Sequence, residues 1–194
     1  MNARQSHGNR GQGPRYRLLR GAVLFLWLIS SSLASQVDAR EKQEYKVKAG
    51  WLVNFIRYVE WPQEKPSPTI VIGILGEDPF APYDIAWPEK VGTSHLQIRQ
   101  LGEFDGENDF SDCHLVFIAA SEKKRIVGIL EALDPLPIIS VSEIKGFVTK
   151  DNGGIFNFLP THTTGSFEVN PTTALEKGFH ISSQLLSRAK QIVR

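Results

Sequence analysis

One stretch decides the fold of this chain: Lys48-Ala-Gly-Trp-Leu-Val-Asn-Phe-Ile-Arg-Tyr-Val-Glu-Trp-Pro62. Its apolar residues recur with the period of an amphipathic helix, and we predict a helix from Gln43 to Glu60 that ends because Pro62 cannot continue it. At about 100° per residue the apolar side chains cover roughly 240° of this helix, whereas packing on one face of a sheet needs a stripe little more than ~100° wide. The helix must therefore contact more than one partner.

The apolar side chains of this helix separate into two stripes. The aliphatic stripe is expected to face the core: Ala49, Leu52, Ile56 and Val59. The aromatic stripe continues beyond the helix: Trp51, Phe55, Tyr58 and Trp61. Two explanations of the aromatic stripe stay open. Either a neighbouring helix covers it, first of all the C-terminal one, or it is a surface that binds another protein, since aromatic residues are frequent anchors of such contacts.

Residues 1–39 have the layout of a cleavable secretion signal, so the protein is expected to be exported. An arginine-rich start without acidic residues precedes an apolar run from Ala22 to Ile29, and small residues place the cleavage after Ala34 or after Ala39. The apolar run is shorter than the roughly 20 residues that a spanning helix needs. We therefore expect a Sec-type signal peptide at 1–39, a single domain at 40–194 and no insertion into the membrane.

The charge of the exported part excludes two classes of partner. Removing residues 1–34 takes away five Arg residues and no acidic residue, which leaves 17 basic against 21 acidic residues and a net charge of about −4. A mildly acidic domain has no electrostatic footprint for nucleic acid or for anionic lipid. Cys113 is the only cysteine, so no disulfide can form within the chain, and its apolar surroundings favour a buried side chain.

Beyond the first helix, buried strands alternate with helices. Continuous apolar runs predict strands that are buried on both faces, as in a parallel sheet, at 69–75, 113–120 and 137–141. An alternating run predicts an edge strand at 95–101. Helices are expected at 81–91, where two prolines interrupt the pattern, and from an N-cap at Ser121 to Leu133.

The C-terminal part adds shorter elements. We expect a strand piece at 146–148 and a hairpin that joins 153–159 to 164–170 through a turn at 160–163. Pro171 should open a last helix with Asn170 as its N-cap, and the apolar stripe of that helix runs from 181 to 193. The predicted fold class is α/β: a three-layer sandwich with a central mixed, mostly parallel sheet and a C-terminal hairpin plus helix.

The sequence carries no complete catalytic or metal-binding motif, and we expect neither an enzyme nor a cofactor or metal. Ser121-Glu-Lys-Lys124 matches the Ser-x-x-Lys nucleophile pattern without its companion motifs, so a helix start is the preferred interpretation. Glu77 and Asp78 follow the first strand, where open α/β sheets bind ligands. These two residues are the candidates for binding a small ligand.

Four segments together resemble the YfiR-like family of small bacterial periplasmic proteins. They occur in the order of the family and span nearly the whole exported chain: Lys48–Pro62, Cys113–Ile118, Gly153–Phe158, and Phe167–Asn170 with Ile181–Leu186. Relatives often carry a cysteine in the first strand that pairs with the one matching Cys113, whereas this chain has Gly73 at that position. The segment at 81–91 is also shorter than the helix of the family.

The resemblance implies a periplasmic signalling regulator without enzymatic activity. The best-known member binds the periplasmic sensor part of an inner-membrane diguanylate cyclase and holds it inactive, which lowers cyclic di-GMP and with it biofilm formation. That member is in turn sequestered by an outer-membrane lipoprotein, and members tend to form homodimers. The expected partners are therefore a membrane signalling protein, a lipoprotein and a second copy, with Trp51, Phe55, Tyr58 and Trp61 as candidate contacts. The alternative function is a periplasmic small-ligand-binding protein that serves a sensor kinase or receptor.

Overall fold

The computed structural model describes residues 36, 38–62, 67–149, 152–160 and 165–193. Most of the expected signal peptide and residues 161–163 of the expected hairpin turn lie outside these residues. The chain divides into two compact units, Met1–Ala39 and Arg40–Arg194. The described residues of the first unit are helical, and the architecture that follows is that of the second. In the described part of the chain, every helix is too short or too polar to cross a membrane.

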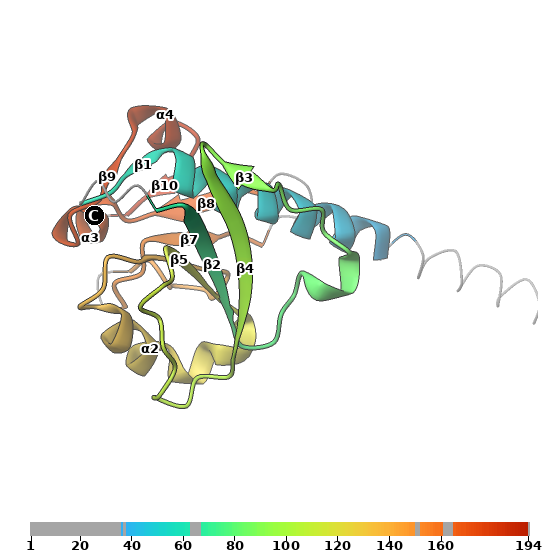
Figure 1. Ribbon diagram of the computed structural model, residues 1–194, viewed down its shortest axis with the longest axis horizontal. Coiled ribbons are helices and arrows are strands. Elements are labelled where there is room, and N and C mark those ends of the chain that lie inside the picture. Colours follow the sequence, from blue (N-terminus) through green and yellow to red (C-terminus); the bar gives the residue numbers. More distant parts are fainter. Residues whose placement is uncertain (1–35, 37, 63–66, 150–151, 161–164, 194) are drawn as a thin grey trace, which may run out of the picture. The chain divides into compact units, whose positions relative to one another are not determined.

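An eight-stranded sheet forms the centre of the second unit (Figure 1). Its strands are, in spatial order, β10 (Gln191–Ile192), β8 (Phe167–Val169), β7 (Phe156–Phe158), β6 (Ile139–Ser142), β5 (Leu115–Ile118), β2 (Thr69–Leu75), β4 (Ser94–Gly102) and β3 (Lys90–Val91). Neighbours are parallel from β7 through β6, β5 and β2 to β4 and also between β10 and β8, whereas β7–β8 and β3–β4 are antiparallel. The prediction of a mixed, mostly parallel sheet is confirmed.

Each face of the sheet is covered by a separate apolar layer, as the continuous apolar runs predict. Ile72 and Ile74 of β2 pack into a cluster with the N-terminal helix (residues 40–57). Their neighbours Val71 and Leu75 point to the opposite face and pack into a cluster with α2 (Ile126–Leu133). Because successive side chains of a strand point to opposite faces, one short run of residues serves both layers. The structure is therefore a three-layer sandwich.

Two predicted helix boundaries were wrong. The N-terminal helix ends at residue 57, and Val59–Glu60 form a strand, β1, that pairs antiparallel with β9 (His180–Ile181). Ser121 does not cap a helix, because a 3-10 segment, η2 (Ala120–Arg125), precedes α2. Its hydroxyl instead accepts a hydrogen bond from the backbone N–H of Glu77 at 3.0 Å. This bond joins the ends of β2 and β5.

The expected last helix is replaced by four short elements. Pro171 and the Asn170 cap open α3 as predicted, but α3 (Pro171–Glu176) is followed by β9, α4 (Ser183–Leu186) and β10. Gly178 ends the helical run with φ of +80°, and a Cβ atom there would lie 2.8 Å from Pro62. The helix therefore stops where the chain must turn closely past the end of β1.

Two further segments differ from the prediction. Residues 81–91 hold only a 3-10 turn, η1 (Ala81–Tyr83), and then β3, because two prolines and the left-handed Asp84 (φ 47°) prevent a continuous helix. Residues 146–148 form a turn rather than a strand. Phe147 and Val148 are nevertheless fully buried, so their apolar character reflects packing under α2 and not strand pairing.

We predict that Gly76→Ala destabilises the protein far more than Gly92→Ala. Both glycines have positive φ, but a Cβ at Gly76 would lie 2.5 Å from Ser121 Oγ, whereas no atom lies within 4 Å of a Cβ at Gly92. We expect Gly92→Ala to lose about 1 kcal/mol through the backbone alone, and Gly76→Ala roughly 2–4 kcal/mol. Urea unfolding of both variants measures the difference, and equal losses would show that the contact of Gly76 with Ser121 is unimportant.

Candidate functional site

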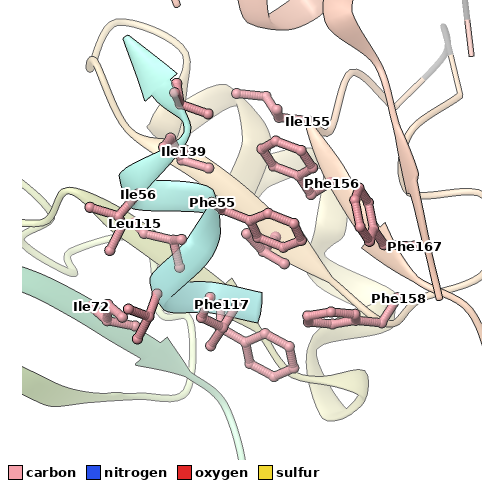
Figure 2. Close-up of a cluster of buried hydrophobic side chains, with 14 of the residues drawn as sticks. Phe55, Ile56, Ile72, Leu115, Phe117, Ile139, Ile155, Phe156, Phe158 and Phe167 are labelled. Carbon is pink, nitrogen blue, oxygen red and sulfur yellow. The ribbon is translucent and has the colours of Figure 1, made fainter. Parts of the chain in front are cut away.

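Phe55, one of the four candidate partner contacts, lies in the core. Its side chain is 0% exposed. The ring stacks on Phe156 with centroids 4.1 Å apart and planes at 6°, and it meets the ring of Phe167 at 73°. Figure 2 shows Phe55 pointing from the helix into the group formed by Phe156, Phe158 and Phe167. Phe55 therefore cannot contact another protein while the domain is folded.

The two tryptophans of the stripe are half-buried against the chain itself. Trp51 lies 4.8 Å from the ring of Phe167, and a Cβ at Gly165 would lie 2.7 Å from the Trp51 ring. Trp61 packs its ring at 84° to Phe179 and at 70° to His114. The cover is thus the β7–β8 hairpin and the segment after α3, rather than a C-terminal helix.

Tyr58 is the member of the stripe that remains accessible. Its side chain is 37% exposed, and the neighbouring Arg57 is exposed as well. The ring of Tyr58 lies where the helix ends and β1 begins. The aromatic stripe therefore supplies one exposed anchor instead of four.

Asp78 shapes the turn after β2, and its carboxylate is already occupied. Its Oδ1 accepts from the backbone N–H of Phe80 at 2.8 Å, and its Oδ2 accepts from the side-chain amide of Gln100. Glu77 is exposed, and its N–H is bound to Ser121. The two candidate ligand-binding residues are adjacent in the structure, but neither lines either of the two grooves described below.

The neighbouring end of β5 is filled by an ion pair between the buried Glu122 and the exposed Arg125. Glu122 is fully buried, and its carboxylate accepts from Arg125 Nε at 2.7 Å and from Arg125 Nη2 at 2.9 Å. A Cβ at Gly76 would lie 2.8 Å from Glu122 Cγ. Open α/β sheets usually bind ligands between the carboxyl ends of such strands. Here that position is occupied by the protein's own side chains.

A second buried charge cluster joins the N-terminal helix to the end of β6. Lys48 is 4% exposed, and its Nζ lies 2.7 Å from Glu44 Oε1 and 2.7 Å from Glu143 Oε2. The hydroxyl of Tyr45 donates to Glu143 at 3.4 Å. Burial and the adjacent carboxylates raise the pKa of the Tyr45 phenol well above its usual range. The only sign of this cluster in the sequence is the i, i+4 spacing of Glu44 and Lys48, which is that of a helical ion pair.

A groove of about 750 Å³ opens at the amino ends of β2 and β5. Its lining includes Trp61, Arg99, Cys113 and His114. Burial lowers the pKa of His114, and its Nδ1 accepts from the backbone N–H of Val71 at 3.2 Å, so the neutral ring carries its proton on Nε2. The groove lies at the sheet edge opposite to the one where a ligand was expected.

Cys113 beside this groove is a buried thiol and not an activated nucleophile. It is 6% exposed, and burial raises the pKa of the thiol. A Cβ at Gly73 would lie 3.1 Å from Cys113 Sγ. The two positions therefore face one another across β2 and β5, and the glycine leaves the cysteine unpaired. Within the described residues, no three His, Cys, Asp or Glu side chains gather to hold a metal ion.

A model of the YfiR/HmsC-like family matches residues 45–190, from within the N-terminal helix to the residue before the last strand. No protein in the curated collection matches the chain.

Two solved structures show a partial likeness of fold. One is the ABC domain in complex with L-Trp from Streptococcus pneumonia, with 11% identity, a TM-score of 0.46 and coverage of 63% of this chain and 55% of that chain. The other is a conserved domain protein from Vibrio cholerae, with 10% identity, a TM-score of 0.45 and coverage of 63% and 54%. This chain spans about half the length of each.

We predict that the residues of the aromatic stripe differ in how much they contribute to stability. Phe55→Ala should cost about 3–5 kcal/mol of unfolding free energy, because the lost ring leaves a cavity against Phe156. Tyr58→Ala should cost about 1 kcal/mol or less, because Tyr58 is 37% exposed and belongs to neither buried apolar cluster. Thermal or urea unfolding measures both. Similar losses in the two variants would contradict the packing described for Phe55.

We predict that His114 makes the domain less stable in mild acid. Since its folded pKa is lowered, its contribution is present above the unfolded value of about 6.5 and is lost as the pH falls through the folded value. His114→Asn keeps an acceptor near the Val71 N–H and cannot take up a proton there. The variant should therefore lose less stability than the wild type between pH 7 and pH 5. His95→Asn, at an exposed position of β4, is the control and should retain the wild-type slope.

Proposed function

Because the chain belongs to the YfiR/HmsC-like family, we propose that it is a periplasmic regulator of an inner-membrane signalling protein. It binds the periplasmic sensor part of that protein and holds it inactive. The target that the family favours is a diguanylate cyclase, so the output is the level of cyclic di-GMP and the tendency to form a biofilm. A second copy of the chain and an outer-membrane lipoprotein are the further partners that we propose.

The family match over residues 45–190 is the observation that carries this proposal. The chemistry of the reactive side chains supports binding over catalysis. The Ser121 hydroxyl is bound to the N–H of Glu77, the Cys113 thiol is kept protonated by burial, and the His114 ring is held by Val71. The secretion signal expected at 1–39 provides the route to the periplasm.

A second function, the binding of a small ligand, is favoured by the groove at the amino ends of β2 and β5. It places Trp61, Arg99 and His114 around a volume of about 750 Å³. This volume is within the range of pockets that hold small molecules, about 300–1,000 Å³. Bound metabolite would then act as an input to the regulator rather than as a substrate.

Deletion of the gene in its own bacterium tests the main proposal. We expect cyclic di-GMP and surface attachment to rise several-fold, and the full chain to restore both when supplied from a plasmid. A chain that lacks residues 1–39 should not restore them, because it stays in the cytoplasm. Unchanged cyclic di-GMP after deletion, or full restoration by the unexported chain, would overturn the proposal.

A further inference from the structure

A second groove, larger than the first, lies between α2 and α3 on the face of the sheet away from the N-terminal helix. Its volume is about 1250 Å³, and its two walls are α2 and α3. The rest of the lining comes from residues 134–138, Ser140, the pair Asn152–Gly153 and Asn170. Its volume exceeds the upper end of small-molecule pockets, about 1,000 Å³. These dimensions fit a protein segment better than a metabolite.

The α2 wall of the groove exposes aliphatic surface. Val127 lines the groove and is 60% exposed, and Leu130 lines it one helical turn further along. Leu175 of α3 is also strongly exposed, at 57%, but it does not line the groove. The aliphatic surface of the groove is therefore Val127 with Leu130 on the α2 wall. Exposed aliphatic side chains beside a groove indicate a contact surface.

The charged residues of the groove are mostly acidic. Lys177 is the only basic residue among its described lining residues, which include Glu131, Asp134 and Glu176. The Nζ of Lys177 is already committed, because it donates to Asp134 Oδ1 at 3.1 Å and to the Asp134 carbonyl at 2.8 Å. It thereby caps the C-terminal end of α2.

Two carboxylates of the groove have no cationic partner among the described residues. These are Glu131 and Glu176, which form no ion pair within the described ranges, and both are exposed. Glu131 belongs to α2 and Glu176 to α3, so each wall carries one. The groove thus combines an aliphatic wall with negative charge on both sides.

We propose that the groove between α2 and α3 docks a cationic amphipathic helix of a partner protein. The aliphatic face of that helix would pack on Val127 and Leu130, and its Lys or Arg residues would meet Glu131 and Glu176. This is the helix-in-groove mode of recognition, with aliphatic anchors one turn apart and flanking charges that set orientation. The inference rests on the proposed function for its biological meaning, because a regulator of this kind needs a surface for its partner.

The test uses the exported protein purified from the periplasm and two synthetic helical peptides. One peptide carries Leu on one face and Lys on its flanks, and the other carries Glu in place of every Lys. Backbone amide shifts in ¹H–¹⁵N spectra report where each peptide binds. We expect the Lys peptide to shift amides of α2, α3 and residues 134–138, and the Glu peptide to bind at least about tenfold more weakly.

A charge swap distinguishes the groove from general attraction to an acidic protein. The variant Glu131→Lys/Glu176→Lys should reverse the preference between the two peptides. Glu89→Lys/Glu107→Lys changes the net charge equally at exposed sites that do not line the groove, and it should keep the wild-type preference. Val127→Ser should weaken binding of the Lys peptide without loss of stability.

Three results would overturn the inference: no binding of the Lys peptide, shifts spread over the surface, or the same response in both double-charge variants. Self-association through α2 and α3 would also overturn it and would assign the groove to a second copy. The cyclic di-GMP measurement after gene deletion is independent of these peptides. A failed peptide test with an intact deletion phenotype would remove the groove assignment and leave the regulatory proposal standing.

Discussion

The stacking of Phe55 on Phe156 is the contact on which the rest of the architecture depends. The N-terminal helix has apolar residues around two thirds of its circumference, and one face of a sheet cannot cover so wide an apolar surface. The central strands cover its aliphatic side through Ile72, Ile74 and Leu115, and the β7–β8 hairpin covers its aromatic side. Aromatic pairs of this geometry add about 0.5–1.5 kcal/mol beyond the area that they bury. The β7–β8 hairpin is thus part of the core, because it buries the aromatic side of the N-terminal helix.

The same packing determines where a ligand or a partner can bind. Turns and ion pairs fill the carboxyl ends of the central strands: Asp78 is used by its own turn, Glu122 is held by Arg125, and Glu143 is held by Lys48. Open surfaces remain elsewhere, at the amino ends of β2 and β5 and between α2 and α3. Open α/β sheets usually bind ligands at the carboxyl ends of their strands. In this protein, side chains of the chain itself fill that position.

Sequence patterns correctly predicted strands that are buried along their whole length. They failed for residues whose burial depends on contacts with segments far away in the sequence. The run Thr69–Leu75 is apolar on both faces and is a central strand, as expected. The stripe from 181 to 193 has helical spacing, yet its residues belong to three different elements. Ile181 pairs with Val59 in β9, Ser182 begins the separate helix α4 as its N-cap, and Ile192 pairs with Val169 in β10. Phe55 could not be assigned to the core, because its partners come from the far end of the chain. The burial of Lys48 likewise depends on Glu143, which the helix sequence does not contain.

The pairing of the first helix with the last hairpin has a consequence for how the chain folds. During synthesis the N-terminal helix emerges long before Phe156, Phe158 and Phe167, so its aromatic side has no native partner while most of the chain is being made. Contacts of such large sequence separation slow folding, and apolar surface that waits for its partner invites aggregation. The domain must therefore close late and nearly all at once, and a chain that ends before β7 would expose Trp51 and Phe55 to whatever apolar surface is nearby.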